Sequence, residues 1–234
     1  MRLASLCGAL GAALMLNLSC AHANQGGIRL NQTRVIFSAG DSAQNLTVEN
    51  SGSRTWLIQT QIASTDDASK GAPVPFIVTP PLFSLKGDSR QLLRILPQDH
   101  SLPADRESLF YLSVSAIPSQ DEPLADRGRL SVGMRFVLKL FYRPRGMSAP
   151  HDDTACRLVI RRDDKGVSVT NPTPYFQTLG ELSLDGKAID VTQQPAMVAP
   201  HSNLSLTSPG RATRASWQTI TDYGGLSTSC QQTL

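Results

Sequence analysis

Residues 129–144 read RLSVGMRFVLKLFYRP, and this stretch decides the fold. Every even-numbered position from 130 to 142 is apolar, whereas four odd-numbered positions carry Arg or Lys. An alternation with a period of two predicts a β-strand with one buried face. Residues 129–142 would extend over about 45 Å, whereas a usual strand has about 5–6 residues. The stretch therefore predicts an unusually long strand that carries cations on one face.

The rest of the first half consists of short apolar stretches separated by turn residues. We predict strands at 28–37, 45–50, 55–63, 76–79, 90–96 and 108–115, before the long strand at 129–142. Short strands at this regular spacing are typical of an all-β sandwich. No stretch has a convincing helical period.

A domain boundary is predicted after the long strand, at PRGMSAPHDDT (144–154), which is rich in Pro, Gly and Asp. The later strands are shorter and more polar: CRLVIRR, GVSVTN, YFQTLGELSL, KAIDV, MVAP, ATRASWQTI and LSTSC. We therefore expect two β-sandwich domains, an N-terminal one at 24–146 and a smaller one at 151–234.

The first 23 residues have the features of a secretory signal peptide. Arg2 precedes an apolar run at 6–18, and Ala21-His22-Ala23 forms a small-x-small cleavage site. Cleavage there would leave 211 of the 234 residues, with no further run long enough to insert into a membrane. A lipoprotein signal at Cys20 is the weaker alternative, because Asn17 stands where an aliphatic residue is expected. We expect an exported, soluble protein.

Export changes how the cysteines are interpreted. Cys156 and Cys230 are the two that lie outside the signal peptide. An oxidising compartment favours a disulfide between them, and two free buried thiols are the alternative. The histidines lack metal-ligand spacing with either cysteine, so we predict no metal site.

Composition and motifs argue against catalysis and against nucleic-acid binding. The chain has 22 Lys and Arg and 19 Asp and Glu, without a basic run interleaved with aromatic residues. No nucleophile elbow, P-loop, zinc-protease or dinucleotide-binding motif is present. The Asp pairs at 66–67, 152–153 and 163–164 are interpreted as solvated loop tips rather than calcium ligands or catalytic acids. We predict no enzyme, no catalytic residue and no cofactor.

Two cations interrupt apolar strands, Arg34 in TRVIF and Lys139 in VLKLFY. Charged residues inside a hydrophobic strand are rare unless they are paired. Each side chain could point outward to solvent, or form an internal salt bridge. Neither cation has an obvious acidic partner in the sequence.

Several motifs, taken together, resemble one known family. They are TRVIF (33–37), FIVTPPLFSL (76–85), RILP (94–97), LPADRESLFYLSVSAIP (102–118), KLFYRP (139–144), NPTPYFQTL (171–179), MVAPHS (197–202) and TDYGG (221–225). This order resembles the usher-dependent periplasmic pilus chaperones of the PapD type. The resemblance implies two immunoglobulin-like β-sandwich domains in a boomerang arrangement. It also implies a periplasmic chaperone whose partners are pilin subunits and an outer-membrane usher.

The resemblance assigns roles to the two cations and to the long strand. Arg34 and Lys139 match the pair that anchors the C-terminal carboxylate of a pilin, and each charge-assisted hydrogen bond would contribute about 1.5–3 kcal/mol. The residues matching the donor strand, which completes the open sandwich of a pilin, are Leu130, Val132, Met134 and Phe136. Strict alternation places Lys139 on the face opposite the donor row, which predicts strong twist or a bulge between them. The exposed donor row also makes a self-capping homodimer an expectation.

Further features follow from the same resemblance. Glu107, Arg143 and Asp222 match salt bridges that fix the angle between the domains, and three ordinary surface charges are the alternative. The short segment 118–129 and the absence of a cysteine pair from the first domain indicate the short-loop branch of the family. One departure concerns Cys156, which opens the second domain, whereas both bridging cysteines are expected near the C-terminus.

One function of another class competes with this interpretation. A secreted immunoglobulin-like adhesin or surface recognition module would share the signal peptide and the sandwich pattern. In such a module Arg34 and Lys139 would have no role.

Overall fold

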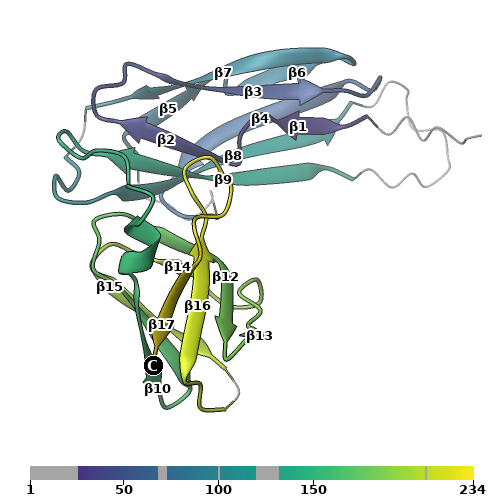
Figure 1. The fold of residues 1–234 in the computed structure, drawn as a ribbon. Coiled ribbons are helices and arrows are strands. Elements are labelled where there is room, and N and C mark those ends of the chain that lie inside the picture. The colour runs from purple at the N-terminus through teal and green to yellow at the C-terminus, as the bar shows by residue number, and fades with distance from the viewer. Residues whose placement is uncertain (1–25, 68–72, 100, 120–131, 209) are drawn as a thin grey trace, which may run out of the picture.

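The computed structural model describes residues 26–67, 73–99, 101–119, 132–208 and 210–234. Apart from the short 3-10 helix η2 (Thr154–Arg157), the elements of this part of the chain are strands. They form two β-sandwiches set at an angle, with the C-terminal one below in Figure 1. This confirms the predicted all-β fold of two immunoglobulin-like sandwiches in a boomerang arrangement.

The first sandwich consists of a four-stranded sheet in the order β1-β3-β7-β5 and a five-stranded sheet in the order β2-β9-β8-β4-β6. Its strands are β1 (Ile28–Leu30), β2 (Arg34–Ser38), β3 (Gln44–Asn50), β4 (Trp56–Ala63), β5 (Phe76–Thr79), β6 (Leu82–Leu85), β7 (Ser89–Pro97), β8 (Ser108–Pro118) and β9 (Met134–Arg143). Alternate residues of both sheets meet in one core, where Leu46, Leu93 and Leu112 are fully buried. This burial is the driving force of the fold.

The predicted strand at 28–37 is in fact two strands. β1 pairs with β3 in one sheet, and β2 pairs with β9 in the other, so the chain crosses between the sheets at 31–33. Asn31 supports the crossing, because its side-chain oxygen accepts a hydrogen bond of 2.8 Å from the backbone N–H of Thr47. Both halves bury apolar residues in the same core, but the buried positions change from the even-numbered Ile28 to the odd-numbered Val35 and Phe37, so the alternation breaks at the polar residues 31–34.

The long strand is β9 (Met134–Arg143), whose residues 134–142 pair with β8 from Ala116 back to Ser108. Residues 129–131 lie outside the described part of the chain, and 132–133 precede the strand. The register with β8 has no shift, so the described part of β9 contains no bulge, and strong twist, the other predicted possibility, stays a prediction. Leu138 and Leu140 point into the core, whereas Lys139 lies on the opposite face.

The neighbour of β9 on its other side is β2, which runs parallel to it. Their pairing begins at Arg34 and Lys139 and ends at Ser38 and Arg143. Residues 134–138 of β9 therefore have no neighbouring strand on this side within the described residues. The sheet thus has an open edge next to Arg34.

The second sandwich consists of a three-stranded sheet, β10-β11-β15, and a five-stranded sheet, β13-β12-β16-β17, in which β14 also pairs with β12. Its strands are β10 (Val159–Asp163), β11 (Gly166–Asn171), β12 (Gln177–Leu184), β13 (Lys187–Ala188), β14 (Met197–Val198), β15 (Ser202–Thr207), β16 (Arg214–Thr219) and β17 (Cys230–Thr233). Trp217 is buried in its core and donates a 2.9 Å hydrogen bond to the carbonyl oxygen of Ala155.

The two cysteines of the second sandwich form a disulfide, Cys156–Cys230, which joins η2 to β17. This confirms the predicted pairing, although Cys156 opens the domain. Two strands, β6 and β15, were absent from the prediction. β15 has the sequence SNLSLT, whose Ser, Asn and Thr residues are equally typical of a loop.

Candidate functional site

The outer face of β9 meets the second sandwich at the angle between the two domains. Phe141 of β9 packs against Phe176 near the start of β12, with ring centroids 5.7 Å apart. Further along the same face, Lys139 lies beside Arg34 at paired positions of the parallel strands β9 and β2. Arg34 also lines a cavity of about 510 Å³ between the domains. The fold therefore brings the two predicted anchor cations side by side at the junction between the domains, where Arg34 lines the cavity and Lys139 lies next to it.

Both cations are partly buried and poorly partnered. The Nζ of Lys139 lies 3.5 Å from the Oγ1 of Thr178, and Nη1 of Arg34 donates to the carbonyl oxygen of Ile220 at 3.4 Å. The Nε of Arg34 is buried and has no hydrogen-bond partner in the part of the chain that the structure describes. Among the described residues, no carboxylate forms an ion pair with either cation.

Burial and mutual repulsion act on the charge state of this pair. Burial lowers the pKa of Lys139, and the neighbouring charge of Arg34 lowers it further. Burial also lowers the pKa of Arg34, an effect that Asp222 partly opposes. Two like charges in a half-buried site favour an incoming anion. The cleft is therefore suited to a carboxylate that the described chain does not supply.

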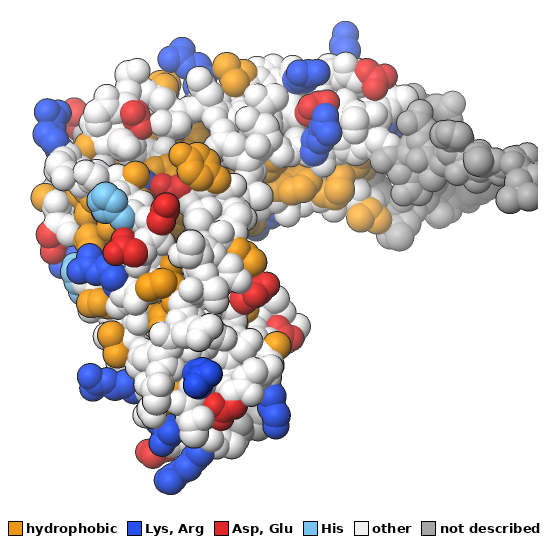
Figure 2. Space-filling view, in the orientation of Figure 1, with side chains coloured by type: hydrophobic (Ala, Val, Ile, Leu, Met, Phe, Trp, Pro, Cys, Tyr) orange, Lys and Arg blue, Asp and Glu red, His pale blue; other side chains and the backbone are white. Residues whose placement is uncertain are grey.

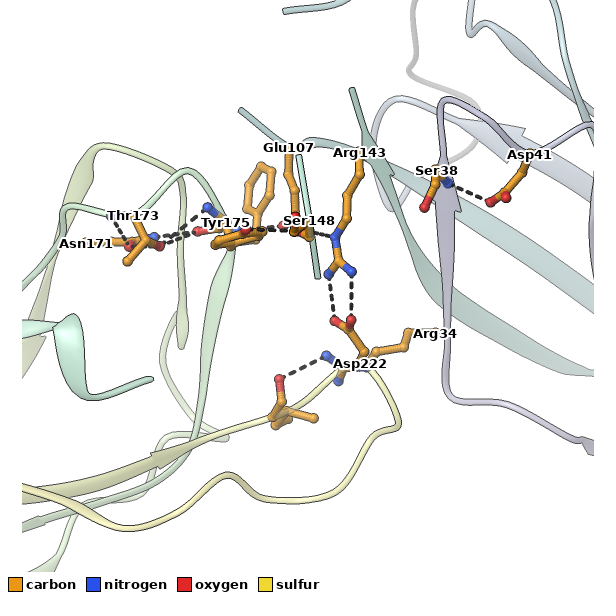
Figure 3. Close-up of polar contacts among 12 residues, drawn as sticks. Arg34, Ser38, Asp41, Glu107, Arg143, Ser148, Asn171, Thr173, Tyr175 and Asp222 are labelled. Carbon is orange, nitrogen blue, oxygen red and sulfur yellow. Dashed lines mark hydrogen bonds and ion pairs between the residues drawn. The ribbon is translucent and has the colours of Figure 1, made fainter. Parts of the chain in front are cut away.

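Three other predicted residues meet at the junction between the domains, as Figure 3 shows. Nε of Arg143 donates to Glu107 at 2.7 Å, and its two terminal nitrogens donate to Asp222, each at 2.7 Å. The second oxygen of Glu107 accepts a 2.8 Å hydrogen bond from the backbone N–H of Phe176. The Arg143 guanidinium also lies over the ring of Tyr175, 5.6 Å from its centroid. These contacts connect both sandwiches.

Glu107 and Arg143 are almost fully buried, whereas Asp222 is partly exposed. Burial raises the pKa of the Glu107 carboxyl, and the charge of Arg143 opposes that rise. A buried ion pair of this kind is costly to break, because removal of one partner leaves an uncompensated buried charge. The network therefore opposes changes in the contact between the domains.

The open edge of β9 carries exposed apolar side chains. The exposed fractions are 62% for Val132 and 36% for Met134. Figure 2 shows hydrophobic side chains on the lower side of the first domain, beside the angle between the domains. Phe136, which the prediction included in the donor row, packs instead against the core of the first sandwich. Leu130 lies outside the described residues.

Several contacts of the site were not predicted. Thr178, the carbonyl oxygen of Ile220 and the backbone N–H of Phe176 each contact a predicted residue from the second domain. Two of these are backbone groups, for which a sequence has no signal. Within the described residues, no group of three or more His, Cys, Asp or Glu could hold a metal ion. No helix in the described part of the chain is both long enough and apolar enough to cross a membrane.

Fold and site define a class: a two-sandwich all-β protein with an open strand edge beside a basic interdomain cleft. Residues 27–148 match the pili and flagellar-assembly chaperone family, PapD N-terminal domain. Residues 153–231 match the pili assembly chaperone PapD, C-terminal domain. The chain belongs to this family. Its members are chaperones, a non-enzymatic role, and the protein is accordingly a pilus-assembly chaperone.

Relatives and solved structures agree with this assignment. The chaperone protein FimC of Escherichia coli K12 is 35% identical over 225 residues, which cover 95% of this chain and 90% of FimC. A chain from the Salmonella enterica SafA pilin–SafB chaperone complex has a TM-score of 0.80 and 32% identity, over 89% of this chain and 96% of that chain. The E. coli chaperone DraB has a TM-score of 0.77 and 32% identity, over 89% and 98% of the two chains.

Proposed function

We propose that the protein is a periplasmic chaperone that binds pilin subunits by donating strand β9 and delivers them to an outer-membrane usher. The observation that carries this proposal is the open edge of β9 directly beside Arg34 and Lys139, which form no ion pair with any described carboxylate. An open edge can accept a strand of another chain. The two cations can donate charge-assisted hydrogen bonds to the C-terminal carboxylate of that strand.

The position of β2 defines the direction of the incoming strand. β2 runs parallel to β9 and begins at Arg34. A pilin strand that occupies the edge at 134–138 and places its terminal carboxylate at Arg34 and Lys139 must also run parallel to β9. It would end where β2 begins.

This arrangement removes the difficulty that Lys139 and the donor row lie on opposite faces. The incoming strand pairs with the edge of β9, so its own side chains reach both faces of the sheet. Val132 and Met134 would enter the open core of the pilin on one face. The carboxylate would reach Lys139 on the other, so no bulge is required.

Burial of apolar side chains and charge-assisted hydrogen bonds to the carboxylate would contribute similar amounts to the free energy of binding. Burial of an exposed apolar side chain contributes about 1.5–3 kcal/mol. A charge-assisted hydrogen bond contributes about 1.5–3 kcal/mol. Backbone pairing along the edge would add to both. The pilin would be held folded, with its own aggregation-prone edge covered.

Several finer assignments belong to the same proposal. Cleavage of residues 1–23 would release the mature protein into the periplasm. Domain boundaries at 24–146 and 151–234 are supported by the two separate cores and by the two family matches. The short segment 118–129 supports the short-loop branch. A free homodimer would cap the exposed Val132 and Met134.

Co-expression with a candidate pilin in a periplasm tests the proposal. Arg34→Ala and Lys139→Ala should each reduce recovery of a one-to-one complex by at least about tenfold, because a charge-assisted hydrogen bond is lost. Arg135→Ala is the matched control. Arg135 is an exposed cation of the same strand, and its guanidinium donates a hydrogen bond of 3.1 Å to the carbonyl oxygen of Asp66. Full recovery with both cleft variants would rule out the carboxylate anchor.

A further inference from the structure

A tight loop of the second domain, residues 220–225, reaches the bend between β1 and β2 of the first domain. Its Ile220 carbonyl oxygen accepts the hydrogen bond from Arg34 at 3.4 Å. Its Gly224 lies against the side chain of Thr33, the residue before Arg34. The loop therefore contacts both the guanidinium of Arg34 and the side chain of the residue before it.

Only glycine fits at position 224. Its φ is +84°, in the left-handed region that side chains disfavour. A Cβ atom built there would lie 2.3 Å from Thr33 Oγ1, closer than a van der Waals contact allows. At the neighbouring Gly225, the nearest atom to such a Cβ would be Thr221 Oγ1, at an ordinary 3.9 Å. The close approach is thus specific to Gly224.

Internal hydrogen bonds make the loop a rigid unit. The backbone N–H of Thr221 donates to the carbonyl oxygen of Gly225 at 2.8 Å, and that of Gly224 donates to Thr221 at 3.0 Å. The Thr221 hydroxyl donates to the same Gly225 oxygen at 3.1 Å. A displacement at Gly224 would therefore also move Ile220 and Asp222.

The guanidinium of Arg34 has little else to fix its direction. Both oxygens of Asp222 are engaged by Arg143, and Nε of Arg34 has no partner among the described residues. What orients Arg34 is the long hydrogen bond to Ile220 and the contact of the neighbouring Thr33 side chain with Gly224.

We propose that Gly224 is a positioning residue for the carboxylate anchor: by allowing the loop to contact Thr33, it holds Arg34 in the direction that binds a chain terminus. This inference rests on the proposed function. It adds that a loop of the second domain determines how selectively Arg34, a residue of the first domain, binds a free C-terminal carboxylate.

The test measures selectivity for a chain terminus. A synthetic peptide of alternating apolar and polar residues is made with a free C-terminal carboxylate and as the carboxamide, and both dissociation constants are measured by calorimetry. Wild-type protein should prefer the acid by about tenfold or more, the effect of one charge-assisted hydrogen bond. Gly224→Ala should reduce this ratio several-fold towards one, while its affinity for the carboxamide stays within about twofold of wild type.

Matched variants separate this effect from a general loss of structure. Gly225→Ala should keep the wild-type ratio. Thr33→Ala removes the atom that a Cβ at position 224 would meet. The double variant Gly224→Ala/Thr33→Ala should therefore regain most of the wild-type preference for the acid peptide over the carboxamide. Thermal unfolding checks that each variant is folded. The strained φ affects the single and the double variant equally, so it cannot produce the recovery.

Three results would overturn the inference. They are an unchanged ratio in Gly224→Ala, an equal loss in Gly225→Ala, and no recovery in the double variant. A wild-type ratio near one is a different result, because it would refute the carboxylate anchor itself and this inference with it.

Discussion

At the scale of single residues, the cleft holds two cations in an arrangement that is unfavourable until a partner binds. Lys139 and Arg34 are adjacent and partly buried, and no carboxylate of the described residues pairs with them. Burial and like charge lower the pKa of Lys139, which means that folding disfavours its charged form. The free protein therefore retains a destabilising charge that an incoming carboxylate would compensate.

Replacement of Lys139 should separate stability from binding. Lys139→Met keeps most of the aliphatic stem and removes the charge. We expect the free energy of unfolding to rise at pH 7, by less than about 1 kcal/mol because water still screens the side chain. A lowered pKa means that the folded state binds its proton less tightly, so wild-type stability should rise with pH below 10.5 and approach that of the variant. Urea denaturation at pH 7 and pH 10 measures this, and a less stable variant at pH 7 would contradict it.

At the scale of elements, β9 is one strand with two tasks. Its C-terminal part, residues 139–142, lies between β2 and β8 and contributes Leu140 to the core. Its N-terminal part is paired with β8 alone and carries the exposed Met134. Both parts follow the same alternation. The period of the sequence alone therefore does not distinguish a residue that packs in the core of this protein from one that is exposed for binding to another protein.

Two substitutions on the same face of β9 should have opposite effects. Met134→Asp should lower recovery of the pilin complex and leave the melting temperature nearly unchanged, because Met134 is exposed and lies outside the core. Leu138→Ala should cost about 2–5 kcal/mol of stability, as is typical when a buried leucine is truncated. Thermal unfolding and co-purification measure the two effects. A large drop in melting temperature for Met134→Asp would assign that residue to the core.

At the scale of the whole molecule, the contact between the domains depends on a small set of buried charges. Arg143 extends from β9 and bonds to Glu107 of the first domain and Asp222 of the second. Glu107 also accepts the backbone N–H of Phe176 in the second domain. Arg34 and Ile220 meet across the same junction, so the geometry of the cleft depends on the angle that these groups hold.

Removal of Arg143 should loosen this junction. Arg143→Met leaves Glu107 buried without its cation and should cost about 3–5 kcal/mol. The double variant Arg143→Met/Glu107→Gln removes the uncompensated charge and should regain a large part of that loss. Small-angle scattering should show a wider spread of interdomain angles in the single variant. Equal stability of the single and double variants would show that the buried charge is not the cause.

Much of the fold could be predicted from the sequence, because alternation reports burial directly. The alternation breaks at the polar residues 31–34, but a local break does not show that the chain crosses there to the other sheet, with Ile28 and Phe37 entering the same core from opposite sides. It also missed the polar strand β15, where Ser and Asn are exposed and local preference is weak. Such features depend on long-range pairing rather than on local sequence.

The site was predictable to a smaller extent. Arg34 and Lys139 stood out as charges in apolar strands, but their adjacency results from a parallel pairing between residues far apart in the chain. The assignments of Glu107, Arg143 and Asp222 came from the family resemblance. The contact between Gly224 and Thr33 depends on the relative placement of two domains, which no local pattern reports.

The point where β2 begins has a consequence for which proteins the chaperone could accept. An incoming strand beside β9 must stop at Arg34, because β2 occupies the edge from there on. A chain that continued past this point, through an added tag or a missed stop codon, would collide with β2. A prematurely truncated chain would lack the strand that ends there. The junction would therefore discriminate against a subunit whose C-terminus is extended or truncated relative to the strand that ends there.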